Sequence, residues 1–217
     1  MRRHSSPGAT AALVGALFHA VFALAGCGST VQTTSPGQGS TVRSASPSGS
    51  PASSVLEGSV APIESPVGSP VAIDQSLLAL LPPTVDGLAV QYSAEATEPV
   101  LRDPHVQAVA TSLVYGVAAR TTSDLLVVAV VRLRPGVFGD SFFQDWRGSY
   151  DTAACAAAGG VVGDAEATIK NRQVYVGRCA AGANTYHLFL ATQNVIVSAT
   201  SIGAAHLGQT LVETLPE

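Results

Sequence analysis

Large apolar and aromatic side chains are scarce over a long stretch near the start of the chain. Between residues 28 and 70, 28 of the 43 residues are Gly, Ser, Thr or Pro, and three carry charge. No aromatic residue occurs between Phe22 and Tyr92. Such a segment buries too little apolar surface to offset the entropy of ordering it, so we expect a disordered tether. O-glycosylation of its Ser and Thr residues is the alternative to a plain spacer.

The hydrophobic core must therefore come from residues 71–217, which we expect to form a single domain. These 147 residues are enough for one core. The whole chain carries 11 basic and 15 acidic side chains, and the domain alone carries 8 basic and 13 acidic ones. A weakly acidic, largely neutral chain of this kind lacks the positive charge with which proteins bind nucleic acid.

The N-terminus has the layout of a secretory signal. Arg2 and Arg3 precede an apolar stretch of 19 residues, 8–26, in which His19 is the only ionisable side chain. As a helix with a rise of about 1.5 Å per residue, this stretch would span about 28 Å. An uncleaved membrane anchor and ordinary signal cleavage are therefore both alternatives to the interpretation that follows.

The apolar stretch ends in Leu24-Ala25-Gly26-Cys27, which resembles the lipobox of bacterial lipoproteins. The resemblance implies that residues 1–26 are removed as a signal peptide and that Cys27 becomes a lipidated N-terminus. Cys27 would carry a thioether-linked diacylglycerol and a further acyl chain on its amine, and two or three such chains hold a protein on a bilayer. Residues 27–70 would then link a membrane-anchored, extracytoplasmic domain to its lipid.

The sequence pattern of the domain predicts helices and strands that do not follow the strict alternation of a doubly wound parallel sheet. This order predicts an α+β fold, with an antiparallel sheet of about five to six strands and two to three helices packed on one face. The expected helices lie at 103–117, 140–158 and 204–215, and a short apolar turn of helix is expected at 77–81. The expected strands lie at 87–93, 124–134, 167–170, 173–179, 185–192 and 195–201, with tight turns at Asn171 and at Gln193-Asn194.

In outline, this plan is similar to the small sensor-like or ligand-binding domains of lipoproteins from high-GC bacteria, including the PsbP-like type. The resemblance covers the last two thirds of the chain. It implies a compact domain that binds a ligand or a partner, and it transfers no active-site residue to this sequence.

Two cysteines remain once Cys27 is assigned to the lipid. In an exported domain, Cys155 and Cys179 are predicted to form a disulfide. If the second predicted helix were unbroken, Cys155 would point about 140° away from its aromatic residues, which their spacing assigns to the core. We therefore expect either a break near Gly148-Ser149, with Asp151 capping a restarted helix, or a disulfide at the surface. The aromatic residues are Phe142, Phe143, Trp146 and Tyr150. Their spacing favours core positions, and a platform for a ligand is the alternative.

No catalytic, metal-binding or cofactor motif is visible in the sequence. His105, His187 and His206 are far apart and lack metal-ligand spacing, and no nucleophile elbow or Ser-x-x-Lys occurs. His187 lies beside Phe189 in a predicted strand and could line a pocket. Arg132, Arg134 and Arg178 would form an anion site if they converged, although surface ion pairing explains them equally well.

These features favour a non-enzymatic module that binds an envelope component, a small solute or a partner subunit. The alternative is an envelope hydrolase whose site is assembled only in the fold, built on His187 with a nearby acid and an arginine such as Arg178. The expected partners are the membrane, through the lipid, and one such ligand, with no cofactor.

The lipobox interpretation makes a direct prediction about Cys27. Cells that produce the wild-type chain should incorporate labelled fatty acid into it and retain it in the membrane fraction, because the acyl chains partition into the bilayer. The Cys27→Ser chain should be neither labelled nor processed. Equal labelling of the two chains would contradict the interpretation.

Overall fold

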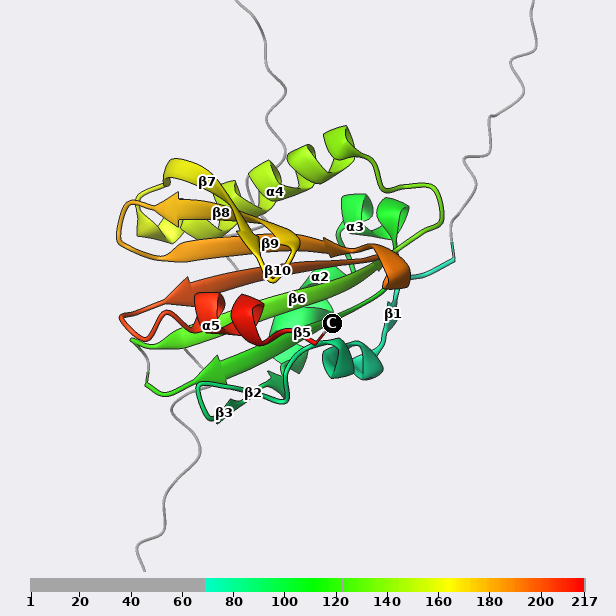
Figure 1. Ribbon diagram of the computed structural model, residues 1–217. Helices are drawn as coiled ribbons and strands as arrows, with labels where there is room; N and C mark the ends of the chain where they lie inside the picture. The colour runs from blue at the N-terminus through cyan, green and yellow to red at the C-terminus, as the bar shows by residue number, and fades with distance from the viewer. Residues whose placement is uncertain (1–68, 122, 217) are drawn as a thin grey trace, which may run out of the picture. The chain divides into compact units, whose positions relative to one another are not determined.

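An eight-stranded sheet organises the residues that the computed structural model describes, 69–121 and 123–216 (Figure 1). The strand order is β1-β5-β6-β10-β9-β8-β7, and β4 pairs with β5 along the edge that it shares with β1. The predicted signal peptide, Cys27 and most of the predicted tether lie outside the described residues. The strands of this sheet are β1 (Ala72–Ile73), β4 (Gln91–Tyr92), β5 (Ala110–Ala119), β6 (Leu125–Leu133), β7 (Val161–Ile169), β8 (Arg172–Cys179), β9 (Asn184–Leu190) and β10 (Val195–Ile202).

The predicted α+β class is confirmed, but the sheet is larger than expected and mixed. The six long strands pair antiparallel, whereas β1 pairs parallel with β5. The sheet has eight strands where five to six were predicted. The two strands that were not predicted are β1 and β5, whereas β4 lies within the strand predicted at 87–93. Strand β1 is two residues long, too short to produce a recognisable pattern of alternation, and β5 was predicted as part of a helix.

The predicted helix over 103–117 is wrong beyond its first turns. Asp103 caps α3 (Pro104–Val109) as expected, but the chain turns extended at Ala110 and continues as β5. The β-branched and aromatic residues of β5 suit a strand, and β6 offers it a full ladder of backbone hydrogen bonds. At Gly116 a Cβ atom would lie 2.7 Å from Cγ1 of Val90, so β5 needs a glycine where residue 90 crosses it.

Helices cover both faces of the sheet, so the prediction that they pack on one face is wrong. On one face lie α2, α3 and α4, and on the other lie α5, the 3-10 helix η1 and the hairpin of β2 and β3. The described residues contain four α-helices, against the two to three predicted. These elements are η1 (Gln75–Leu80), β2 (Thr84–Val85), β3 (Leu88–Ala89), α2 (Ala94–Val100), α4 (Asp140–Cys155) and α5 (Leu207–Thr214), with short 3-10 turns η2 (Ala156–Ala158) and η3 (Ala191–Gln193).

The central strand β6 explains why both faces are covered. Leu126, Val128 and Val130 join the core under α5 and η1, while the alternate residues Leu125 and Val127 join the core under α2, α3 and α4. A strand that is apolar on both sides must be buried on both sides. Its position in the chain, 125–133, agrees with the predicted covered strand at 124–134.

The hairpin turns lie where the sequence predicts them. Lys170 and Asn171 adopt positive φ angles of 48° and 60° between β7 and β8. Asn194 has a φ of 53° just before β10, and its side-chain amide donates to the Leu133 carbonyl oxygen at 3.1 Å. Asn tolerates this left-handed conformation better than most residues, which is the reason for the prediction.

Helix α4 runs without a break, and Cys155 at its end is buried, so both alternatives offered for Cys155 are wrong. Cys155 lies at disulfide distance from Cys179, with the two Cα atoms 5.1 Å apart. The pair has its own small apolar cluster with Ala183, away from the aromatic residues of α4. Cys155 and the aromatic residues of α4 therefore point in different directions from one unbroken helix, and Cys179 at the end of β8 lies on the side of Cys155.

The disulfide should contribute strongly to stability. A double variant, Cys155→Ala with Cys179→Ala, should lower the free energy of unfolding by about 3 kcal/mol. The disulfide joins residues 24 positions apart, and without it the unfolded chain regains the conformational entropy that this loop had lost. Urea unfolding of the two proteins measures the difference. A reducing agent should destabilise the wild type and leave the double variant unchanged; an equal effect on both would contradict the assignment.

Candidate functional site

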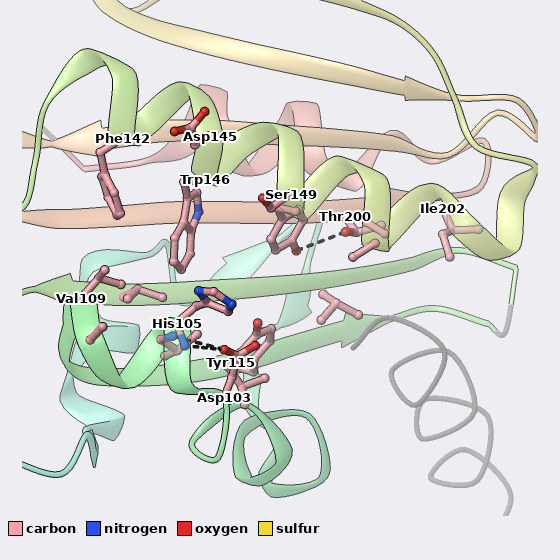
Figure 2. Close-up of a pocket in the computed structure, with 18 of the residues that line it drawn as sticks. Asp103, His105, Val109, Tyr115, Phe142, Asp145, Trp146, Ser149, Thr200 and Ile202 are labelled. Atoms are coloured by element: carbon pink, nitrogen blue, oxygen red, sulfur yellow. Dashed lines mark hydrogen bonds between the residues drawn. The ribbon is translucent and has the colours of Figure 1, made fainter. Parts of the chain in front are cut away.

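A cleft of about 420 Å³ opens between α3 and α4 on one face of the sheet (Figure 2). Its floor is formed by residues of β5, β6 and β10, including Tyr115, Val127 and Thr200. One wall comes from α3 and the end of α2, and the other comes from the length of α4. A cavity of this size and largely apolar lining is typical of small-molecule sites.

The cleft lies over the middle of this face of the sheet, between the two groups of helices. The short helix α3 contacts β5, whereas α4 packs on β7, β8, β9 and β10. Had residues 110–117 continued α3, as the sequence suggested, they would have lengthened that wall; instead they form the strand beneath it. The apolar floor is thus a consequence of the helix ending at Val109.

The wall from α4 carries an aromatic stripe. Phe142, Trp146 and Tyr150 recur every four residues and line the cleft, while Phe143, one position further, is 6% exposed and packs in the core. For all four, the sequence favoured core positions over a platform for a ligand. That assignment holds for Phe143, whereas the other three divide their surface between core contacts and the cleft.

Two phenols on the floor and wall of the cleft supply hydrogen-bonding groups. The Tyr150 hydroxyl accepts from Thr200 Oγ1 at 3.1 Å and donates to the Ser198 carbonyl oxygen at 3.4 Å. Burial raises the pKa of Tyr150 to about 12, and burial, with the nearby Tyr150 and Asp103, also raises the pKa of Tyr115. Both phenols are therefore protonated at neutral pH.

The charged groups that line the cleft are acidic. Asp103 lies on the α3 side, where its Oδ1 atom accepts from the backbone N–H of His105 at 2.7 Å, and Asp145 lies on exposed α4 surface. No Lys or Arg is among the described residues that line the cleft. His105 is exposed and also lines the cleft.

Behind the α4 wall, His187 lies in a buried polar network. Its Nε2 atom is 2.8 Å from Asp151 Oδ1, and its Nδ1 atom is 2.9 Å from Ser198 Oγ. Trp146 Nε1 donates to the same Ser198 hydroxyl at 3.0 Å, and Thr185 Oγ1 donates to Asp151. A proton on Nε2 of the imidazole satisfies every one of these contacts, with Ser198 donating to Nδ1.

The carboxylate of Asp151 is held in its charged form. Burial acts to raise its pKa, but hydrogen bonds from His187 and Thr185 and the charges of His187 and Arg147 together lower the pKa below its ordinary value. The Arg147 guanidinium stacks 3.5 Å from the centre of the Tyr175 ring. Asp151 was expected to cap a restarted helix. It instead contacts His187 and is therefore the acid that was expected near this histidine without being identified.

The Asp151–His187–Ser198 contacts do not form a usable nucleophile. Ser198 is 1% exposed, its oxygen already receives the Trp146 N–H, and it does not line the cleft. An attacking serine must reach a bound substrate. This arrangement is a structural network that fixes α4 to β9 and β10.

The structure does not bring His187 together with the three arginines singled out in the sequence. Arg132 lies 3.4 Å from Asp74, and Arg134 donates to backbone carbonyls, including that of Gln107 at 3.1 Å. Arg178 is exposed and packs over Gly163. Arg132 and Arg134 thus have separate partners, and Arg178 lies on another strand, β8, so the three do not form one anion site.

Within residues 69–121 and 123–216, no group of three or more His, Cys, Asp or Glu side chains is arranged to hold a metal ion. None of the helices in this part of the chain is long and apolar enough to cross a membrane. No protein-family model matches the chain, and neither a curated protein nor a solved structure matches it. The interpretation of the site therefore depends on its own geometry.

The buried network predicts a pH-dependent effect of Asp151→Asn. Because the pKa of Asp151 is lowered on folding, its charge stabilises the fold above the unfolded value of about 3.9, and this stabilisation is lost as the pH falls through the folded value. The variant should lose about 2 kcal/mol near neutral pH, and the loss should shrink below about pH 4. Urea unfolding at several pH values measures this.

Asp164→Asn is the matched control, because Asp164 is an exposed carboxylate on β7 outside the network. It should change the unfolding free energy little at any pH. A loss for Asp151→Asn that stays constant from neutral to strongly acidic pH would contradict the charged network.

Proposed function

We propose that this protein is a lipid-anchored module on the extracytoplasmic face of the cell membrane, and that it binds an apolar small molecule in the cleft between α3 and α4. The anchor rests on the resemblance of Leu24-Ala25-Gly26-Cys27 to a lipobox at the end of an apolar stretch. The Gly-, Ser-, Thr- and Pro-rich segment up to residue 70 provides the spacer between lipid and domain.

One observation carries the binding role: the cleft itself. Its volume of about 420 Å³ falls in the range of sites that enclose small ligands, and its walls are mainly Val, Leu, Ala and aromatic side chains. The hydroxyls of Tyr150 and Thr200 supply the few polar groups that orient a ligand in such a site. An apolar cavity open to solvent gains stability when an apolar molecule fills it.

The competing function, an envelope hydrolase, has one observation in its favour, the contact between His187 and Asp151. The burial of Ser198 and its absence from the residues that line the cleft argue against it. Incubation with ester, glycan and peptide substrate panels is the test. Turnover that His187→Ala abolishes, with the fold intact, would establish the hydrolase and overturn the binding module.

Blocking the cleft should remove the ligand. Ala153 lines the cleft from α4, so the larger side chain of Ala153→Phe should occupy the space that a ligand needs. Small molecules extracted from the full-length protein, purified from membranes of the cells that produce it, can be compared by mass spectrometry. The species bound in the cleft should be present with the wild type and depleted at least about tenfold with Ala153→Phe.

Ala165→Phe is the control, because Ala165 is exposed on β7 and does not line the cleft. This variant adds the same aromatic ring elsewhere and should retain the same molecules as the wild type. If all three proteins carry the same molecules in the same amounts, the cleft is not the binding site and the proposal is wrong.

A further inference from the structure

Resting on the proposed function, we infer that the cleft selects a cationic ligand, an alkylated ammonium group attached to an apolar body. The inference concerns the charge of the ligand, which the volume of the cleft leaves undetermined. It rests on the charges, the aromatic rings and the polarity of the lining, taken in turn.

The charges of the lining oppose an anion. Asp103 on the α3 side and Asp145 on α4 are carboxylates, and the described lining contains no Lys or Arg to neutralise a ligand carboxylate or phosphate. The whole of residues 71–217 carries 8 basic and 13 acidic side chains, so the wider field has the same sign. An anion entering the cleft would lose hydration without gaining a partner of opposite charge.

The aromatic rings favour a cation. Phe142, Trp146 and Tyr150 line one wall, and Tyr115 lies on the floor. Figure 2 shows Trp146 projecting from α4 toward the side of the cleft that carries His105 and Asp103. Ring faces attract ammonium groups, Trp most strongly, and aromatic rings beside a carboxylate are a common means of binding quaternary ammonium groups.

The low polarity of the cleft decides which kind of cation fits. A metal ion or a primary ammonium needs several oxygen acceptors to replace its water. Asp103 Oδ1 already accepts two backbone N–H groups, and Thr200 Oγ1 donates to the Tyr150 hydroxyl. The side chains of Asp145 and Ser149 are exposed on α4, so the oxygen atoms of the lining do not enclose a cation from several sides. An alkylated ammonium is weakly hydrated and presents methyl groups to the rings, so it needs no such shell.

Three probes with one carbon skeleton separate charge from shape. They are benzyl(2-hydroxyethyl)dimethylammonium, its uncharged carbon isostere 3,3-dimethyl-4-phenylbutan-1-ol, and the anion 3,3-dimethyl-4-phenylbutanoate. The full-length chain is placed in vesicles of digalactosyldiacylglycerol, a lipid without net charge or ammonium. The chain has one tryptophan, Trp146, so its emission reports on the cleft. The titrations are done at about pH 8, where a histidine side chain is ordinarily neutral, so that the carboxylates are the charged groups of the lining.

The cation should bind at least about tenfold more tightly than the alcohol, and the carboxylate should bind most weakly. Asp103→Asn should weaken binding of the cation about fivefold and leave the alcohol unchanged. Asn is as good a helix cap as Asp, so the variant removes the charge while keeping α3, and unchanged binding of the alcohol verifies this. Asp164→Asn, on exposed β7, should change neither.

The outcomes separate this inference from the function on which it rests. Binding of the alcohol or the carboxylate as tight as that of the cation, sensitive to Ala153→Phe, would overturn the charge selectivity and leave a small-molecule cleft. An Asp103→Asn chain that binds the cation as the wild type does would also overturn it. If no probe changes the emission of Trp146, the inference fails, and the molecules retained by the purified protein decide the binding role separately.

Discussion

The fold depends on one strand that is apolar on both sides. Alternate residues of β6, from Leu125 to Leu133, enter two separate cores, so neither face of the central sheet can be left to water. One core is sealed by α5, η1 and a small hairpin, and the other by α2, α3 and α4. Strands β5 and β10 pair with β6 on its two edges and extend the sheet in both directions.

The cleft is the part of this arrangement where cover is incomplete. On the α5 side, one continuous cluster of buried residues closes the face. On the opposite face, α3 and α4 line two sides of the cleft, and Val127 and Val131 of β6 line its floor. The fold thus tolerates an apolar surface at its centre, and this surface is where the site lies.

Much of the fold was predictable because its signals are local. The composition of β6, the start of α4 at Asp140, the asparagine turns and the Cys155–Cys179 pair each depend on a few neighbouring residues.

The cleft was not predictable. Val106, Val109, Leu113 and Val117 have helical spacing, while every second residue of 113–117 suits a strand equally well, and only pairing with β6 decides between them. Tyr115 was missed with β5. His187 and Asp151 are separated by 36 residues and meet only because α4 lies across β9.

The indole of Trp146 belongs to two systems at once. Its ring lines the cleft, and its N–H is committed to Ser198 in the interior, next to His187. A molecule that displaces the ring must also disturb the interior hydrogen bonds, so occupancy of the cleft and integrity of the network are thermodynamically linked. Linkage is reciprocal: a substitution deep in the sheet that never meets the ligand would alter its affinity by the same free energy with which the ligand alters the network.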